Sequence, residues 1–469
     1  MTGLTEILHF GKESISFRSM IKLVLRLSIP AIMAEVSSVI MQYIDAAMSG
    51  SLGAHASASI GLVSTTTWLI GGLCISVSAG FSIQTAQLIG AGRDEEARDV
   101  FRQSLIAAVM FGLLLSAVSI LISGKLPIWL GGDEELRSDA SGYFLIYACA
   151  LPAVQLRQLA GSMLQCSGDM KTPSILNIML CALDVIFNAL FIFPSGYFKV
   201  PKTNIGIYGA GMGVQGAALG TACAEIVTAL CMLFFACVKS DKLAFLKGGS
   251  WKIHLKCLKT AVRLAVPAAI ERTIMSSAYV VSTLIIAPLG TVAVAANSLA
   301  VTAESFCYMP GYGIGSAATT LVGQSIGAKR KDLARSFART AALIGVLIMS
   351  ATAVIMFIAA PGIFSLLTPD EEVRTLGTAV LRIEAFAEPM YAASIVCAGA
   401  LRGAGDVAGP SILNLVSMWG VRISLAFVLV PHIGLYGIWI AMCVELCVRG
   451  ILFLLRLFRE KWLGKGAIV

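Results

Sequence analysis

Two aspartates lie within the long apolar stretches of this 469-residue chain, and an asparagine follows one of them by four positions. Asp45 is near the end of the first stretch, and Asp184 and Asn188 are in the fifth. Residues four positions apart share one face of a helix, so Asp184 and Asn188 can hold one ligand together. Carboxylate and amide oxygens are ligands that suit Na⁺, and a carboxylate can also hold a proton. Because ionisable groups inside a membrane are usually functional, these three residues are candidates for binding a cation or a proton.

Glutamates in apolar stretches of the second half of the chain include Glu271, Glu304 and Glu388. They are secondary candidates for the same chemistry, because ionisable groups inside a membrane are usually functional. Glu271 can equally form an ion pair with Arg272 or Arg382, so it also has a purely structural interpretation.

The elements that carry these residues are predicted to be membrane-spanning helices. Hydrophobic residues make up 57% of the chain and charged residues 13%, whereas a soluble domain is about a quarter charged. Apolar runs long enough to cross a bilayer recur throughout. We predict an all-α membrane protein with twelve transmembrane helices, near residues 23–47, 57–89, 104–123, 141–164, 174–194, 212–237, 262–287, 293–322, 340–360, 378–400, 411–431 and 436–456.

Several classes of protein are disfavoured by the same composition. The net charge of +8 comes from short clusters between apolar runs, so we expect no nucleic-acid partner. The twelve cysteines form no C-x-x-C pair, and the four histidines fall in or beside loops. We therefore expect no bound cofactor, no disulfide framework and no enzymatic activity. The first twenty residues lack the pattern of a cleaved signal peptide, so the first helix should remain as an anchor.

The distribution of basic residues predicts the orientation. With both termini on one side, 25 of the 35 Lys and Arg residues lie on that side, counting Arg26, Arg263 and Arg456 at the ends of their spans, 5 lie on the other side and 5 lie deeper within helices. Basic residues accumulate on the cytoplasmic side of membrane proteins. We expect a multi-pass protein of the cell membrane with cytoplasmic N- and C-termini.

The chain contains two copies of one unit, offset by 237 positions. Pro30 aligns with Pro267, and "PSILN" occurs at both 173–177 and 410–414, with the register kept from Pro30 to Pro194. Six helices per copy is an even number, so both copies enter the membrane from the same side. This parallel repeat is typical of alternating-access transporters. We predict an N-terminal six-helix lobe at 1–237, a cytoplasmic connector at 238–261 and a C-terminal six-helix lobe at 262–469.

The repeat separates structural polar residues from functional ones. Features shared by both copies mostly encode the fold, whereas a buried polar residue in one copy alone needs another reason. Asn177 recurs as Asn414 and is therefore predicted to be structural. The other candidates have counterparts of different type: Asp45 and Ser282, Asp184 and Val421, Asn188 and Leu425, Glu271 and Ala34, Glu304 and Thr67, Glu388 and Leu151.

Four motifs closely resemble the multidrug and toxic compound extrusion (MATE) family: "LVGQSIGA", "LRGAGD", "LQCSGDMKTPSILN" and "VQGAALGTA". The resemblance implies a V-shaped pair of lobes that exports amphipathic organic cations or drugs, driven by Na⁺ or H⁺ entry. It also implies a cation site at Asp45, Asp184, Asn188 and Thr221. The fifth-helix pair departs from the family pattern, because it reads Asp-x-x-x-Asn instead of Asn-x-x-x-Asp.

Another branch of the family places a Na⁺ site in the C-terminal lobe. Its carboxylate positions fall on Met275 and Tyr391 in this chain, with Glu271 and Glu388 about one turn away. The resemblance therefore does not carry that site over.

We expect a monomeric cation-coupled antiporter with H⁺ or Na⁺ as the coupling ion and small amphipathic cations as substrates. Two alternatives remain open. A lipid-linked oligosaccharide flippase of the same superfamily would favour a strongly basic cavity. A membrane-embedded enzyme would need a nucleophile motif or metal-ligand spacing that the chain does not show.

Overall fold

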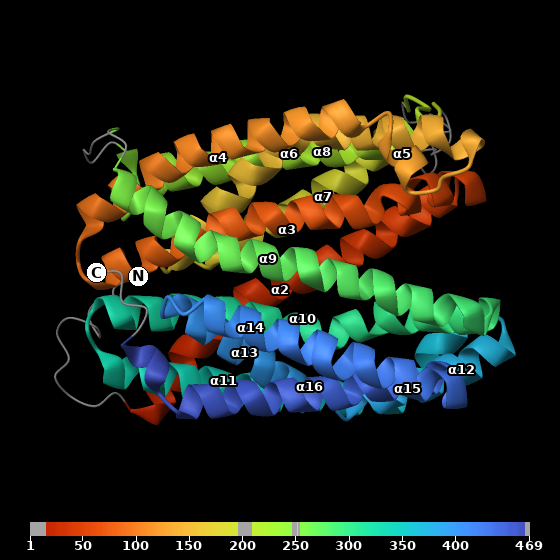
Figure 1. Ribbon diagram of the computed structural model, residues 1–469. Helices are drawn as coiled ribbons and strands as arrows, with labels where there is room; N and C mark the ends of the chain where they lie inside the picture. The colour runs from red at the N-terminus through yellow and green to blue at the C-terminus, as the bar shows by residue number, and fades with distance from the viewer. Residues whose placement is uncertain (1–15, 196–208, 246–250, 252–253, 465–469) are drawn as a thin grey trace, which may run out of the picture.

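The structure is a computed structural model that describes residues 16–195, 209–245, 251 and 254–464. Within these residues the backbone is helical apart from turns and one isolated antiparallel bridge between Pro194 and Ala210. The predicted all-α fold is confirmed. Figure 1 shows the helices running roughly parallel in two groups, the first half of the chain above the second.

The first half comprises seven helices and a final turn: α2 (Phe17–Gly50), α3 (Ala54–Gly90), α4 (Asp94–Ile122), the short α5 (Leu126–Trp129), α6 (Glu134–Cys166), α7 (Lys171–Ile192), α8 (Gly213–Phe234) and the π-helical turn η1 (Phe235–Lys239). The second half comprises α9 (Leu255–Ile286), the 3₁₀ turn η3 (Ala287–Leu289), α10 (Thr291–Gly327), α11 (Lys331–Leu367), α12 (Glu371–Ala385), α13 (Glu388–Gly403), α14 (Ala408–Ser417), the π-helical segment η4 (Met418–Ile423), α15 (Ser424–Ile433), α16 (Leu435–Phe458) and the 3₁₀ turn η5 (Lys461–Leu463).

Eleven helical segments of the described chain are long and apolar enough to cross a membrane. The remaining predicted span, 378–400, is not one helix, because it breaks at residues 386–387 into α12 and α13. Pro389 follows the break; proline has no N–H to donate and its ring clashes with the carbonyl four residues earlier. Its repeat counterpart, Pro152, lies inside the uninterrupted α6. The same proline is thus tolerated in one copy and ends a helix in the other.

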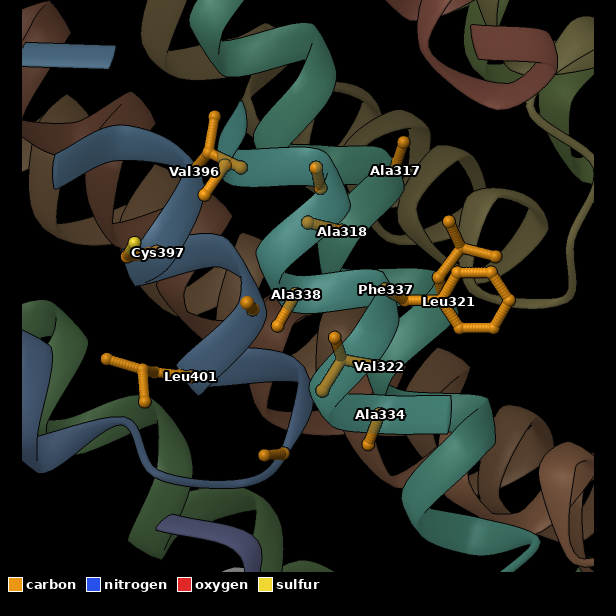
Figure 2. Packing of buried hydrophobic residues seen from close by; sticks show 14 of the residues in the cluster. Ala317, Ala318, Leu321, Val322, Ala334, Phe337, Ala338, Val396, Cys397 and Leu401 are labelled. Atoms are coloured by element: carbon orange, nitrogen blue, oxygen red, sulfur yellow. The ribbon is translucent and has the colours of Figure 1, made fainter. Parts of the chain in front are cut away.

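The apolar cores are rich in alanine, and the largest of them joins residues of α10, α11 and α13 to Val24 and Leu27 of α2. Figure 2 shows one such core, in which small residues of α10 and α11 pack against α13. Close approach of this kind is typical of helices in lipid, where packing replaces the hydrophobic effect. The lobe boundaries predicted around the connector 238–261 remain a prediction, since part of that segment lies outside the described residues.

Two helices cross from one half to the other. α2 packs against α7 of its own half and against α10, whereas α9 packs against α14 of its own half and against α3. In Figure 1, α9 runs obliquely across the boundary between the two groups.

The halves also meet where α3 and α10 end. We call this the basic end, because the basic residues of the turn before α11 and of its first turns, at 329–339, lie there. Gly90 packs on the backbone of Gln324 and Gly327 packs on that of Gln87, so closely that a Cβ at either glycine would overlap a carbonyl. The Gln87 amide donates to the carbonyl of Gly403 at 3.2 Å, and the Gln324 amide donates to that of Cys166 at 2.8 Å. The two halves are therefore closed against each other at this end.

Candidate cation site

The structure brings Asp45, Asp184 and Asn188 together at the junction of α2 and α7. The Asn188 amide donates to Asp45 Oδ1 and to Asp184 Oδ2, both at 3.0 Å. Asp184 and Asn188 are each 1% exposed, whereas Asp45 is only partly buried. One amide thus links two carboxylates, and Asp45 is the most exposed of the three residues.

This group keeps unused acceptor oxygens. Asp184 Oδ1 and Asn188 Oδ1 are buried and have no hydrogen-bond partner among the described residues. Asp45 and Asp184 also lie close enough for their carboxyl groups to share a hydrogen bond, which requires a proton on one of them. A buried acceptor without a donor is costly. The oxygens therefore fit a bound proton or a hard cation such as Na⁺.

Glycines of α8 allow this helix to pack closely against α7 beside the site. Gly216 packs on the backbone of Phe191, and Gly220 packs so closely on Asn188 that a Cβ there would overlap its amide oxygen. These glycines lie in the motif "VQGAALGTA". Their spacing places the next residue, Thr221, within reach of Asp184 through its hydroxyl. All four residues predicted for the first-half site are thus neighbours.

Asn177 takes part in a different interaction on the same helix. Its amide oxygen accepts from Arg157 Nη1 at 3.2 Å, and Arg157 Nη2 also donates to Glu225 Oε1 at 3.1 Å. The Arg157–Glu225 pair links α6 to α8, and the sequence analysis did not identify it. The sequence did contain a signal for this ion pair, because Arg157 and Glu225 each lie within a predicted membrane span.

Glu271 is held in an ion pair, but with neither of the predicted arginines. Both its carboxylate oxygens accept from Arg402 at 3.0 Å, and Ser411 and Asn414 each donate to it at 2.6 Å. The expectation of a pair with Arg272 or Arg382 was wrong. The cause is tertiary: α14, which carries Ser411 and Asn414, packs on α9, and Arg402 lies in the last turn of α13, directly before α14.

Glu304 and Glu388 meet each other and a third carboxylate, Glu384. One oxygen from each lies within 4.8 Å of the others, and all three side chains are buried. No oxygen of Glu384 or Glu388 has a hydrogen-bond partner among the described residues. The break between α12 and α13 lies between these two glutamates. Sequence reasoning missed Glu384, although its spacing of four from Glu388 was visible.

A membrane protein of two similar six-span halves, with buried carboxylates between its spans, has the architecture of a secondary transporter. The MatE family model matches residues 30–190 and 267–428, one block in each half. The chain belongs to this family, as its motifs predicted.

Two relatives match along nearly their whole length. The probable multidrug resistance protein NorM of Thermotoga maritima is 27% identical over 452 residues, covering 94% of this chain and 93% of that protein. The multidrug resistance protein MdtK of Pectobacterium atrosepticum is 26% identical over 444 residues, covering 92% and 93%.

Solved structures share the fold. A crystal structure of MATE in complex with MaL6 superposes with a TM-score of 0.88 at 22% identity, covering 99% of this chain and 100% of that one. A MOP superfamily transporter from Pyrococcus furiosus, described as having a binding pocket of reverse polarity, gives 0.87 at 21% identity, covering 99% of each chain.

Proposed function

We propose that this protein exports amphipathic organic cations in exchange for H⁺ or Na⁺. The observation that carries the proposal is the buried group in which Asn188 bridges Asp45 and Asp184. Full-length relatives named as multidrug resistance proteins support the choice of substrate class.

The coupling ion would bind at Asp45, Asp184, Asn188 and Thr221. The unpaired oxygens of Asp184 and Asn188 supply acceptors, and the partly exposed Asp45 supplies a route from solvent. A proton or Na⁺ would remove the repulsion between two neighbouring carboxylates. Substrate and ion would then favour different conformations of the first half, and such differential binding is sufficient to couple their movements.

A second candidate coupling site comprises Glu304, Glu384 and Glu388. Arg422 acts on Glu304 and Glu384, but one guanidinium cannot balance three buried carboxylates, so this group also fits protons or a cation. We rank it second because the described residues give it no partly exposed member.

We further propose that both termini face the cytoplasm, that the protein works as a monomer in the cell membrane and that it needs no cofactor beyond its coupling ion. The charge bias of 25 to 5 supports the orientation. A lipid-linked oligosaccharide flippase is less well supported, because the first-half site is acidic and would repel a pyrophosphate group.

Efflux from proteoliposomes tests the proposal. Purified protein would be reconstituted with ethidium inside the vesicles, and an inward proton gradient or Na⁺ gradient would be imposed in separate samples. We expect ethidium release under one of the two gradients and none after that gradient is collapsed. Release that continues without either gradient would contradict coupling, and no release of any cationic dye would contradict drug export.

A further inference from the structure

A groove on the outer surface lies between α3, α4 and α9. It measures about 920 Å³, and of its lining side chains only Gln103 is polar. The Gln103 side-chain oxygen already accepts from the backbone N–H of His254. All three helices are membrane spans. We propose that this groove binds one acyl chain of an anionic phospholipid.

The length of the groove matches one leaflet. Its wall on α9 runs from Leu258 to Ala269, and its wall on α4 runs from Gln103 to Leu115. At 1.5 Å per residue these walls are about 17 and 18 Å long. The hydrocarbon of one leaflet is about 15 Å thick, half of the roughly 30 Å core. A single chain entering from the basic end would fill the groove to the middle of the membrane.

Charge at the mouth of the groove selects the headgroup. Lys256 and Lys259 lie on the first turn of α9, where the groove wall begins at Leu258, and Arg263 follows one turn further along. All three are exposed, and none forms an ion pair with a described residue. Basic residues near the surface of an anionic leaflet are attracted to its headgroups. A phosphatidylglycerol headgroup would therefore be preferred over a zwitterionic one.

The repeat shows that two positions lining the groove carry larger side chains in the other copy. At the corresponding place beside α10 and α11, Ile344 of α11 belongs to a buried core and Ile32 of α2 packs against that core. Their counterparts at the offset of 237 are Ala269 and Ala107, which both line the groove. Protein side chains thus fill one gap, whereas two alanines leave the other open. A lipid chain in the open gap would take the place of the two isoleucines.

The same comparison supplies the test. Ala107→Ile with Ala269→Ile transfers the filled arrangement into the groove, and Ala351→Ile on the exposed face of α11 is the matched control. The six added side-chain carbons would occupy space that the acyl chain fills, so binding of 1-palmitoyl-2-oleoyl-phosphatidylglycerol should weaken about tenfold or more. Native mass spectrometry of the full-length protein titrated with this lipid would measure the change.

We expect the wild type and Ala351→Ile to retain one phosphatidylglycerol that the double variant loses. Lys256→Gln with Lys259→Gln and Arg263→Gln should remove the preference over phosphatidylcholine. Equal retention by the double variant, or no preference for phosphatidylglycerol in the wild type, would overturn the proposal. If the double variant lost binding of ethidium but kept binding of phosphatidylglycerol, the groove would belong to the substrate. That result would also overturn the proposal.

A second measurement needs no variant. Phosphatidylglycerol with a diazirine on its acyl chain would be photo-crosslinked to the wild type, and peptides would be mapped. Crosslinks concentrated at 103–115 and 258–269 would support the proposal, whereas an even spread over the lipid-facing helices would contradict it.

Discussion

At the scale of single residues, the first-half site depends on one amide. Asn188 donates both its hydrogens to carboxylates, one from its own helix and one from α2. Its own oxygen and one oxygen of Asp184 are left as acceptors, which is the polarity that a proton or cation requires. The reversed order of the fifth-helix pair therefore does not remove the oxygen set.

Removing one charge at this site should stop coupled transport. Asp45→Asn or Asp184→Asn keeps the size of the side chain, and we expect gradient-driven ethidium efflux to fall below about a tenth of the wild-type rate. Membrane insertion and thermal stability should change little. Efflux from proteoliposomes, normalised to protein content, is the measurement.

Glu304→Gln and Glu388→Gln distinguish the two candidate sites. We expect both variants to keep gradient-driven efflux if the first half carries coupling. Normal pumping by the Asp45 and Asp184 variants, with failure of Glu304→Gln or Glu388→Gln, would move coupling to the second half.

Gly220→Ala should disturb the site without changing any polar group. The added methyl would overlap the amide oxygen of Asn188, so either α8 must move away or the amide must rotate. We expect efflux to drop at least roughly tenfold, with a loss of about 1–3 kcal/mol in stability. The control is Gly61→Ala in α3, where a Cβ would meet nothing. Unchanged efflux in Gly220→Ala would show that this close approach is not needed.

At the scale of elements, hydropathy predicted the spans well, because it determines which segments can cross a bilayer. The repeat did not predict the break before Pro389, because the corresponding Pro152 lies inside an uninterrupted helix. The meeting of Glu384 with Glu304 depends on that break and on how α10 packs, which no spacing along the chain encodes. Asp184 and Asn188 were predictable because they are neighbours on one helix.

The closure at the basic end should weaken when its two glutamines are shortened. Gln87→Ala with Gln324→Ala removes two hydrogen bonds between the halves, worth about 1 kcal/mol each. The equilibrium should then shift by roughly thirtyfold toward a state open at this end. Distances between spin labels placed on α3 and α10 near this end, in a background without native cysteines, would report the shift. An unchanged distance distribution would mean that other contacts hold the end closed.

At the scale of the whole molecule, the spans form two similar groups with α2 and α9 crossing between them (Figure 1). Four loops or helix ends meet at the basic end. Lys242 pairs with Asp94 at 2.7 Å, and Glu460 pairs with Arg335 at 2.6 Å and Arg339 at 2.9 Å. These ion pairs join segments that the charge count assigns to one side of the membrane.

The predicted orientation can be checked by labelling. With native cysteines replaced, Ser51→Cys at the end of α2 should react with an impermeant maleimide added outside intact cells. Ser336→Cys near the basic end should react only after the cells are opened. The opposite pattern would reverse the orientation and the direction proposed for transport.

The contact between α3 and α10 has the symmetry of a homodimer. Gly90 touches Gln324 as Gly327 touches Gln87, and each glutamine reaches a carbonyl at corresponding positions, 403 and 166. An interface of this isologous kind is self-complementary, so it needs only one kind of chain to form. Two copies of a single six-helix ancestor could have closed against each other through it. After fusion of the two copies, each half could change independently. The acidic residues of the two candidate sites then arose at different positions in the two halves, while the contact between α3 and α10 kept its symmetry.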